Sequence, residues 1–385
     1  MNRKIAIAVN ASWNLFNFRT GLIRALIAGG YQVVTLAPVD EYVPRLEASG
    51  CRHVAVPMES RGTNPASDML LFYRFLTVLR RERPAVFLGY TIKPNVYGSL
   101  AAGALGIPVI NNIAGLGTAF HKESYLTTLA RMLYRLALRR SSRVFFQNED
   151  DRRQFIAEGL VQAGRTERIP GSGVDLDRFA PNPVLCPAEG RVLKKEGQFR
   201  FLLVARMLWD KGVREYVEAA RRIRARHPSA ECCLLGPLEV QNPAAISRAQ
   251  MDAWSSEGVV RYLGVSDDVR VHLVDADCVV LPSYYREGVP RSLLEAAAMG
   301  CAVIASDSTG CRETVDGGVT GLLCRPRDVV DLVEKMEQML AMTREARATM
   351  GRRGREKVER EFDERIVIER YLGAIRELLD RSGPS

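Results

Sequence analysis

Residues 282–296 read PSYYREGVPRSLLEA, and this stretch decides which fold we expect. An apolar run ends at Pro282, a loop follows, and a helix begins near Pro290, because proline suits the first turn of a helix. Glu287 lies in the loop and Glu295 lies inside the helix, so their carboxylates can hold hydroxyl groups of two different rings. The alternative is that Glu287 only stabilises the helix dipole and Glu295 is a surface residue.

Short apolar runs alternate with helical patterns on both sides of this stretch. Such alternation predicts parallel βαβ units, because parallel strands need a crossover connection. In the first half the expected strands are residues 4–9, 32–37, 54–57, 85–88, 109–113 and 143–147, with helices at 17–28, 69–81 and 96–105. In the second half they are 199–205, 230–235, 259–263, 278–282 and 302–305, with helices at 213–227, 292–299, 344–361 and 365–379. The fold class is therefore α/β, with two doubly wound domains.

The domain boundaries follow from the length and from one proline-rich segment. A chain of 385 residues favours two domains at about 100–200 residues each. We expect an acceptor-binding domain at 1–170, a linker at 171–198 and a nucleotide-sugar domain at 199–360. Residues 361–385 are expected to form a helix that packs back toward the first domain. Two such sheets offer strand ends to a central cleft, where their ligands bind.

A second motif, RMLWDKG at residues 206–212, lies where the strand 199–205 gives way to a helix. Arg206 and Lys211 can converge on one diphosphate, since arginine offers a planar fork and lysine a point charge. The N–H groups at the start of the next helix would complete an anion site. The alternative is a pair of exposed cations on a loop.

The spacing from Glu287 to Glu295 resembles the E-x7-E motif of retaining glycosyltransferases of family 4, which have the two-Rossmann GT-B fold. Four further stretches are similar to that family: GVDLDRF at 173–179, GCAVIASD at 300–307, GCRETV at 310–315 and GLL at 321–323. The resemblance covers nearly the whole chain. It implies transfer of a sugar from a UDP-sugar with retention of the anomeric configuration, without a metal and without a cofactor besides the donor substrate.

The resemblance also assigns roles to single residues. Arg206 and Lys211 would hold the diphosphate and, together with Glu287, carry catalysis. Glu295 would bind the ribose. The donor sugar would contact Glu287 and the backbone of Gly288, Val289 and Pro290, while Gly236 would approach the nucleotide and the backbone near Val265 would border the base.

The first half supplies the loops that we expect to bind the acceptor. Residues 10–19 (NASWNLFNFR) stand where many family members have a Gly-rich loop, and residues 90–98 (YTIKPNVYG) lack the histidine that many have. Aromatic and amide groups suit sugars. The expected acceptor-binding residues are Asn14, Asn17, Lys93, Asn95, Asn112 and Thr118; the alternative is that each only shapes a turn. These stretches most resemble the subgroup acting on polyprenyl-diphosphate-linked sugars, such as bacterial N-acetylgalactosaminyltransferases.

Positive charge is concentrated in the first half of the chain. Residues 1–170 hold 22 Lys or Arg and 12 Asp or Glu, whereas the remainder holds 32 and 33. Such asymmetry predicts an anionic partner. Arg131, Arg135 and Arg139 form a row on a predicted amphipathic helix at 126–140, which could lie on an anionic membrane surface. The alternative is that this helix covers the sheet and its arginines only face water.

Other classes fit the sequence less well. No apolar run approaches the roughly 18 residues of a membrane-spanning helix, and no secretory leader is expected. No GxGxxG follows the first strand, so an NAD enzyme is not expected, nor is a nucleic-acid partner. The prediction is a hexosyltransferase on the cytoplasmic face of the bacterial inner membrane. It moves an N-acetylhexosamine or hexose from a UDP-sugar to a polyprenyl-diphosphate-linked saccharide, in surface polysaccharide (lipopolysaccharide or capsule) or glycoprotein glycan assembly. The alternatives are a sugar-nucleotide epimerase of the same fold and a non-catalytic sugar-binding assembly subunit.

Overall fold

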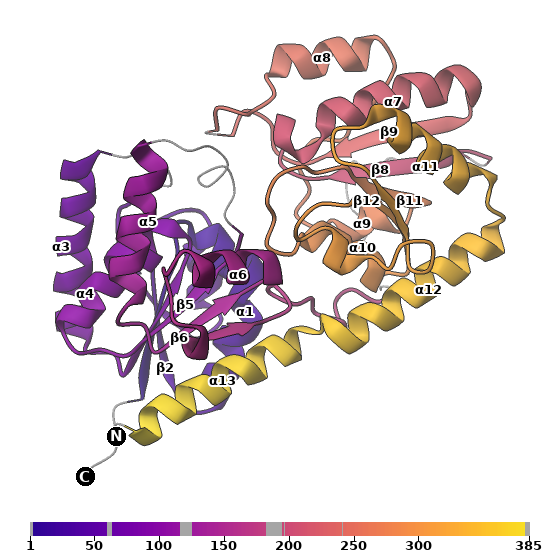
Figure 1. The fold of residues 1–385 in the computed structure, drawn as a ribbon. Helices are drawn as coiled ribbons and strands as arrows, with labels where there is room; N and C mark the ends of the chain where they lie inside the picture. The colour runs from indigo at the N-terminus through magenta and orange to yellow at the C-terminus, as the bar shows by residue number, and fades with distance from the viewer. Residues whose placement is uncertain are drawn as a thin grey trace. The chain divides into compact units, whose positions relative to one another are not determined.

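Two separate parallel sheets organise the chain in the computed structural model (Figure 1). The structure describes residues 3–59, 64–115, 125–181, 195, 197–240 and 242–381. It divides the chain into two compact units: Met1–Ser172 together with Glu364–Ser385, and Gly173–Asp363.

In the first unit, the described strands form one parallel sheet in the order β3-β2-β1-β4-β5-β6-β7. Their bounds are β1 Lys4–Ala8, β2 Gln32–Ala37, β3 Arg52–Ala55, β4 Val86–Tyr90, β5 Val109–Ile113, β6 Arg143–Phe146 and β7 Thr166–Arg168. The helical segments are α1 Ser12–Ala28, α2 Val43–Glu47, α3 Pro65–Glu82, η1 Pro94–Gly98, α4 Ser99–Ala104, α5 Tyr125–Leu138, α6 Glu149–Ala157, η3 Ala163–Arg165 and α13 Glu364–Arg381. After Lys4, β1 is apolar throughout, and β4 is apolar along its whole length, because helices cover the sheet on both faces.

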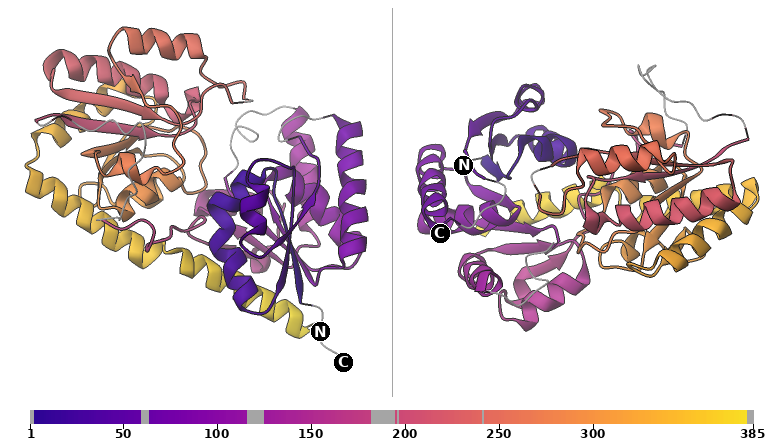
Figure 2. Two further views of the ribbon diagram at one scale, coloured as in Figure 1. Left: turned by 180° about the vertical axis from the view of Figure 1, so that it is seen from behind. Right: turned by 90° about the horizontal axis from the view of Figure 1, so that it is seen from above.

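Helix α13 lies against α1 on one face of this sheet, although the two are far apart in sequence (Figure 2). Both helices share a core with β1 and β4, to which α13 contributes Val367, Tyr371, Ala374 and Ile375. Helices α3 and α4 share a second core with the same sheet. The end of the chain is therefore part of the first unit.

In the second unit, the described strands form a parallel sheet in the order β10-β9-β8-β11-β12-β13. They are β8 Phe199–Val204, β9 Ala230–Leu235, β10 Arg261–Tyr262, β11 Cys278–Leu281, β12 Ala302–Ser306 and β13 Leu322–Cys324. The helical segments are η4 Trp209–Lys211, α7 Val213–Arg226, α8 Arg248–Ser256, α9 Arg270–Leu273, α10 Arg291–Ala298, η5 Arg312–Thr314, α11 Val329–Ala341 and α12 Arg344–Glu361. One core packs α7, α8 and α11 on the sheet, and the other packs α10 and the end of α12.

The strand order reverses once in each sheet, and this places the site. The reversal lies between β1 and β4 in the first unit and between β8 and β11 in the second. At such a switch point the two connecting helices leave on opposite faces, so a crevice opens at the carboxyl ends of the strands. Ligand-binding groups are therefore expected in the loops after β1, β4, β8 and β11.

The expected linker at 171–198 is wrong over its first part. Val174, Leu176 and Phe179 are buried in the core of the second unit, and the Val174 N–H donates to the carbonyl of Phe362. The prolines of this segment suggested a linker, but the spaced apolar residues before them are what bind it to the domain.

The expected start of the first helix is also wrong. Residues 12–16 were expected in a loop, yet α1 begins at Ser12, where Ala11 provides no side-chain cap. A carboxylate from another loop replaces the cap, since the Trp13 N–H donates to Asp40 Oδ2 over 2.9 Å. This partner is distant in sequence, so the helix start had no local signal. Strands β7 and β13 and helices α8 and α11 were likewise not predicted.

Candidate active site

The loop after β8 carries Arg206 and Lys211 to the switch point of the second unit. Gly212 ends this loop with a φ of +74°, and a Cβ there would overlap the carbonyl oxygen of Pro282. Only glycine fits such an approach without strain. The position therefore holds the Arg206–Lys211 loop directly against the end of β11.

The loop after β11 is held to the same place by backbone hydrogen bonds. The N–H groups of Tyr284 and Tyr285 donate to the Asp210 carbonyl over 3.1 and 3.0 Å. Ser306 and Ser308 donate their hydroxyls to the Ser283 carbonyl, the latter over 2.8 Å. Three neighbouring strand ends thus fix the backbone that leads to Glu287.

Lys211 and Glu287 form an ion pair at the centre of this arrangement. The side chains are 12% and 10% exposed, and the Ser283 hydroxyl donates to Glu287 Oε1 over 2.9 Å. The Lys211 ammonium also lies 5.0 Å from the centre of the Tyr285 ring. At this burial both charges are poorly screened by solvent, so the pair is a strong local dipole at the strand ends.

Glu287 is packed as tightly on its backbone side. A Cβ on Gly310, whose φ is +86°, would overlap the Gly288 carbonyl oxygen and lie 2.7 Å from Glu287 Cβ. Burial raises the pKa of the neighbouring Cys311 thiol to about 12, and the charge of Glu287 acts in the same direction. Cys311 is therefore an uncharged packing residue beside the carboxylate.

The remaining predicted donor-site residues lie on the same unit. Arg206 is exposed and makes no ion pair with any residue that the structure describes. The Gly236 N–H donates to the Gly264 carbonyl over 2.8 Å, and a Cβ on Gly236 would overlap the carbonyl oxygen of Ala205. Val265 is 68% exposed next to that contact. The structure thus brings the loops after β8, β9 and β10 together.

Glu295 has a partner that was not predicted. It accepts hydrogen bonds on Oε1 from Arg291, one turn earlier in α10, with Nε at 3.1 Å and Nη2 at 3.0 Å. Arg291 in turn donates from Nη1 to the Gly173 carbonyl over 2.9 Å. The carboxylate is therefore oriented by the segment that opens the second unit.

The sequence did not predict four residues that surround the Lys211–Glu287 pair and Glu295: Ser283, Asp210, Arg291 and Gly310. Each lies within or beside a motif that stands out for its charged residues or for its resemblance to the family. The Arg291–Glu295 and Ser283–Glu287 contacts are local, at a spacing of four residues. The contacts of Asp210 and Gly310 join different strand ends, so no local pattern pairs those two residues.

Two of the predicted acceptor-binding residues are corrected by the structure. Asn95 and Asn112 are buried, and their amides are used inside the first unit. Asn95 donates from Nδ2 to the Asn112 carbonyl and accepts from Asn111, over 2.8 and 2.9 Å. Asn112 donates to the Tyr371 hydroxyl over 2.8 Å and accepts from Gln147 over 3.2 Å. Asn95 joins η1 to β5 and Asn112 joins β5 to α13, so both amides are already used within the first unit.

The other predicted acceptor residues differ in their surroundings. Asn14 and Asn17 are half-buried on α1, and Asn17 Nδ2 donates to the Trp13 carbonyl over 2.9 Å. Lys93 forms an ion pair with Asp68 of α3 over 2.9 Å. Thr118 lies outside the described residues.

The predicted arginine row on α5 is not uniform. Arg131 is paired with Glu158 over 2.9 Å, with both side chains 25% exposed, so its charge is neutralised within the unit. Arg135 is exposed and donates to the Glu158 carbonyl over 2.9 Å. Arg139 is exposed as well. Arg131 is therefore removed from the predicted membrane surface, because its guanidinium has a carboxylate partner.

Two features are absent from the described part of the chain. There, no group of three or more His, Cys, Asp or Glu side chains is arranged to hold a metal ion. Across the same residues, no helix is both long enough and apolar enough to cross a membrane.

Comparison with known families identifies the chain. Residues 188–357 match the family described as glycosyl transferases group 1, and residues 18–171 match the glycosyl transferase 4-like domain. The chain is a glycosyltransferase. The predicted family and the predicted class of enzyme are confirmed.

This glycosyltransferase has characterised relatives among bacterial enzymes. It is 28% identical over 381 residues to the N,N'-diacetylbacillosaminyl-diphospho-undecaprenol alpha-1,3-N-acetylgalactosaminyltransferase of Campylobacter jejuni, covering 96% of this chain and 97% of that one. It is 25% identical to the UDP-Gal:alpha-D-GlcNAc-diphosphoundecaprenol alpha-1,3-galactosyltransferase of Escherichia coli, over 78% of this chain and 76% of the relative.

Solved structures confirm the fold of the glycosyltransferase. Anabaena HepE in complex with UDP and glucose superposes with a TM-score of 0.78 at 18% identity, covering 97% of this chain and 100% of that one. A glycosyltransferase from Rickettsia africae superposes with a TM-score of 0.77 at 17% identity, over 98% and 99% of the two chains. The fold is GT-B, as predicted.

Proposed function

We propose that this glycosyltransferase moves a sugar, an N-acetylhexosamine or a hexose, from a UDP-sugar to a polyprenyl-diphosphate-linked saccharide. The reaction retains the anomeric configuration and serves the assembly of a bacterial surface polysaccharide or glycoprotein glycan. One observation carries the donor half of this proposal: Lys211 and Glu287 form an ion pair at the switch point between β8 and β11, and Arg206 lies on the same loop as Lys211. In doubly wound sheets this crevice is where nucleotides bind.

In the donor complex Lys211 leaves Glu287 and moves to the diphosphate, where the Arg206 fork joins it. The two cations then stabilise the negative charge that grows on the diphosphate as its bond to the sugar breaks. Glu287, still held by Ser283, is freed to accept hydrogen bonds from the sugar hydroxyls. Glu295, oriented by Arg291, binds the ribose.

The acceptor class is supported by the two bacterial relatives, whose names both specify an undecaprenyl diphosphate carrier. The same names specify alpha linkages. The common UDP-hexoses carry the sugar in the α configuration, so an α product corresponds to retention. In the proposed step the acceptor hydroxyl oxygen forms the bond to the anomeric carbon and the bond to the diphosphate oxygen breaks. The proton passes to the departing diphosphate, and no metal or further cofactor takes part.

A donor screen tests this proposal. The enzyme is incubated with UDP-N-acetylgalactosamine, UDP-N-acetylglucosamine, UDP-galactose or UDP-glucose and a synthetic polyprenyl-diphosphate saccharide, with and without EDTA. We expect one donor to extend the acceptor by a single α-linked sugar, at a rate that EDTA leaves unchanged. A β linkage would overturn retention, and loss of activity in EDTA would overturn metal independence. Conversion of the donor without acceptor would instead indicate an epimerase. An absence of turnover with every donor would favour the non-catalytic subunit.

Docking on the anionic inner membrane, on its cytoplasmic face, is the second part of the proposal. Met132 and Leu136 are exposed apolar residues of α5, and the exposed Arg135, Arg139 and Arg140 lie beside them in sequence. Apolar side chains that enter the headgroup region, flanked by arginines, are the features of a surface-bound helix.

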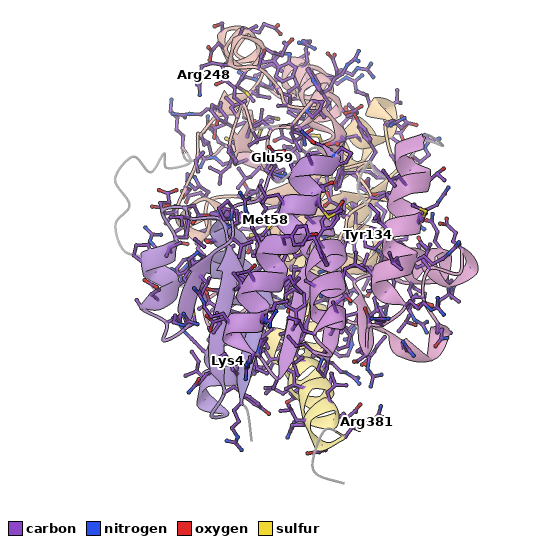
Figure 3. The ribbon with its side chains drawn as sticks, turned by 90° about the vertical axis from the view of Figure 1, so that its left-hand side faces the viewer. Lys4, Met58, Glu59, Tyr134, Arg248 and Arg381 are labelled. Carbon is purple, nitrogen blue, oxygen red and sulfur yellow. The ribbon has the colours of Figure 1, made fainter. Side chains whose placement is uncertain are left out.

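Figure 3 views the first unit from the side that α3 covers, with Lys4 at the start of β1 and Met58 beyond the end of β3.

The combined change Met132→Ser, Arg139→Gln and Arg140→Gln should weaken binding to vesicles that contain phosphatidylglycerol by about tenfold or more. Each basic residue near an anionic surface contributes about 1 kcal/mol. Vesicle sedimentation measures the effect. Arg352→Gln with Arg353→Gln, an exposed pair on α12, is the matched control and should bind like the unchanged enzyme. Equal binding by both variants would contradict docking through α5.

A further inference from the structure

Arg19 of α1 is a buried cation in the first unit, with only 6% of its surface exposed. Its guanidinium lies 4.2 Å from the centre of the Tyr90 ring, at the last residue of β4. Side chains of a helix point back toward its N-terminus, so Arg19 is directed toward the carboxyl ends of β1 and β4. This is the switch point of the first sheet.

Arg19 has no counter-ion among the residues that the structure describes. The Nε atom of Arg19 is fully buried and has no hydrogen-bond acceptor. Its Nη1 and Nη2 atoms make no hydrogen bond to a described residue and are not fully buried, so solvent can reach them. The Tyr90 hydroxyl at the same place is also buried, and the Tyr371 hydroxyl lies beside it. Burying a charge that is neither paired nor hydrogen-bonded is costly, and the Tyr90 ring offsets only part of this cost.

Acidic residues at the same edge of the sheet are already engaged elsewhere. Asp40 accepts hydrogen bonds from the backbone N–H groups of Trp13 and Tyr42, each over 2.9 Å. Asp68 is paired with Lys93 and accepts from the Tyr97 hydroxyl over 2.8 Å. Neither carboxylate is therefore left to neutralise Arg19.

We infer that Arg19 binds a phosphate oxyanion at the switch point of the first unit. The planar fork of an arginine matches two phosphate oxygens, and a pre-formed, partly desolvated cation binds an anion more strongly than a surface one does. The same chemistry fits free phosphate or pyrophosphate and the diphosphate of a lipid-linked acceptor. Assigning it to the acceptor rests on the proposed function, whereas the oxyanion site itself does not.

Inorganic pyrophosphate is the probe for the site itself. It is titrated calorimetrically into enzyme already saturated with UDP, so that the nucleotide site of the second unit is occupied. Arg19→Gln should weaken pyrophosphate binding at least about tenfold, because charge-assisted hydrogen bonds to a guanidinium are lost. Arg24→Gln removes the same charge from an exposed position of the same helix and should leave binding unchanged. Undiminished binding by Arg19→Gln would overturn the inference.

Thermal unfolding separates a ligand site from a structural role. Without ligand, Arg19→Met should melt at or above the temperature of the unchanged enzyme, since it removes an unpaired buried charge. Pyrophosphate should raise the melting temperature of the unchanged enzyme but not that of Arg19→Met. A lower melting temperature without ligand, combined with the same rise on adding pyrophosphate, would show that Arg19 only supports the fold. If Arg19→Met does not fold, Arg19→Lys keeps the charge and should bind pyrophosphate more weakly than the unchanged enzyme; equal binding would overturn the inference.

Kinetics then identify the source of the phosphate. With a short-chain prenyl-diphosphate saccharide, Arg19→Gln should raise the KM for the acceptor at least about tenfold and leave the affinity for UDP unchanged. With the matching phosphate-free glycoside, Arg19→Gln and the unchanged enzyme should have the same KM. An unchanged KM for the diphosphate acceptor, with pyrophosphate binding lost, would overturn the acceptor assignment and leave a site for free phosphate. If no acceptor is ever glycosylated the proposed function fails, while the pyrophosphate titration still decides the site.

Discussion

Replacing Lys211 by alanine should lower kcat/KM for sugar transfer by about 10³-fold, equivalent to about 4 kcal/mol. The change removes a cation that we expect to hold the diphosphate. It also leaves the Glu287 carboxylate, which is 10% exposed, without its lysine partner. Truncating one member of a desolvated charge pair typically costs about 2–5 kcal/mol. This cost lowers the stability of the second unit and not kcat/KM, because the proposed donor complex breaks the pair in any case. Initial rates over a range of UDP-sugar concentrations measure the loss.

Lys335→Ala is the matched control for this variant. Lys335 lies on α11 of the same unit and pairs with Asp331 over 3.7 Å, a partly exposed pair whose loss should change kcat/KM by no more than about twofold. Lys211→Arg should recover part of the activity because it restores the charge, but in a fork of different shape. If Lys211→Ala were as active as Lys335→Ala, the donor site would have to lie elsewhere.

Gly212→Ala should destabilise the second unit by about 2–4 kcal/mol. A left-handed alanine costs about 1 kcal/mol, and forcing its Cβ against the Pro282 carbonyl oxygen adds about 1–3 kcal/mol of overpacking. The Arg206–Lys211 loop must shift to relieve the overlap, so activity should fall as well. Urea unfolding followed by tryptophan fluorescence measures the change, in a Trp13→Phe background that leaves Trp209 and Trp254 of the second unit as reporters.

Gly300→Ala measures the cost of the left-handed backbone conformation without the overlap that a Cβ makes at Gly212. Gly300 has the same φ of +74°, but a Cβ there would meet nothing within 4 Å. It should therefore cost only the left-handed conformation, about 1 kcal/mol. Equal losses for the two variants would mean that the contact with Pro282 does not hold the loop in place.

Much of the fold could be predicted because its signals are local. The strands Gln32–Ala37, Val109–Ile113 and Ala230–Leu235 and the helix Arg344–Glu361 have the predicted bounds, since uninterrupted apolar runs and helical periodicity are read directly from neighbouring residues. The start of α1 could not be predicted, because Asp40 caps it from another loop. Residues 174–179 were mistaken for linker because their partners are in α12 and the core of the second unit.

The candidate site divides in the same way. Arg206, Lys211, Glu287 and Glu295 stand out because charged residues at fixed spacing next to a glycine are unusual at the end of an apolar strand. Asn95 and Asn112 misled the prediction, since an amide after a strand looks alike whether it faces a ligand or a buried tyrosine. Only the packing of α13 over β5 shows that the Asn112 amide bonds to Tyr371.

The sequence by itself determined the α/β class and the family, and it predicted the cationic and acidic residues of the candidate donor site, because these follow from composition, periodicity and short motifs. The tertiary structure decided that Lys211 meets Glu287, that Arg291 reaches the Gly173 carbonyl, and that Arg19 meets the Tyr90 ring instead of an acid. Strand order sets these pairs, and strand order depends on which crossovers bury the most apolar surface over the whole sheet. The order of amino acids along the chain does not show how much apolar surface each arrangement of the strands buries. The charge partners of the site are therefore visible only in the folded chain.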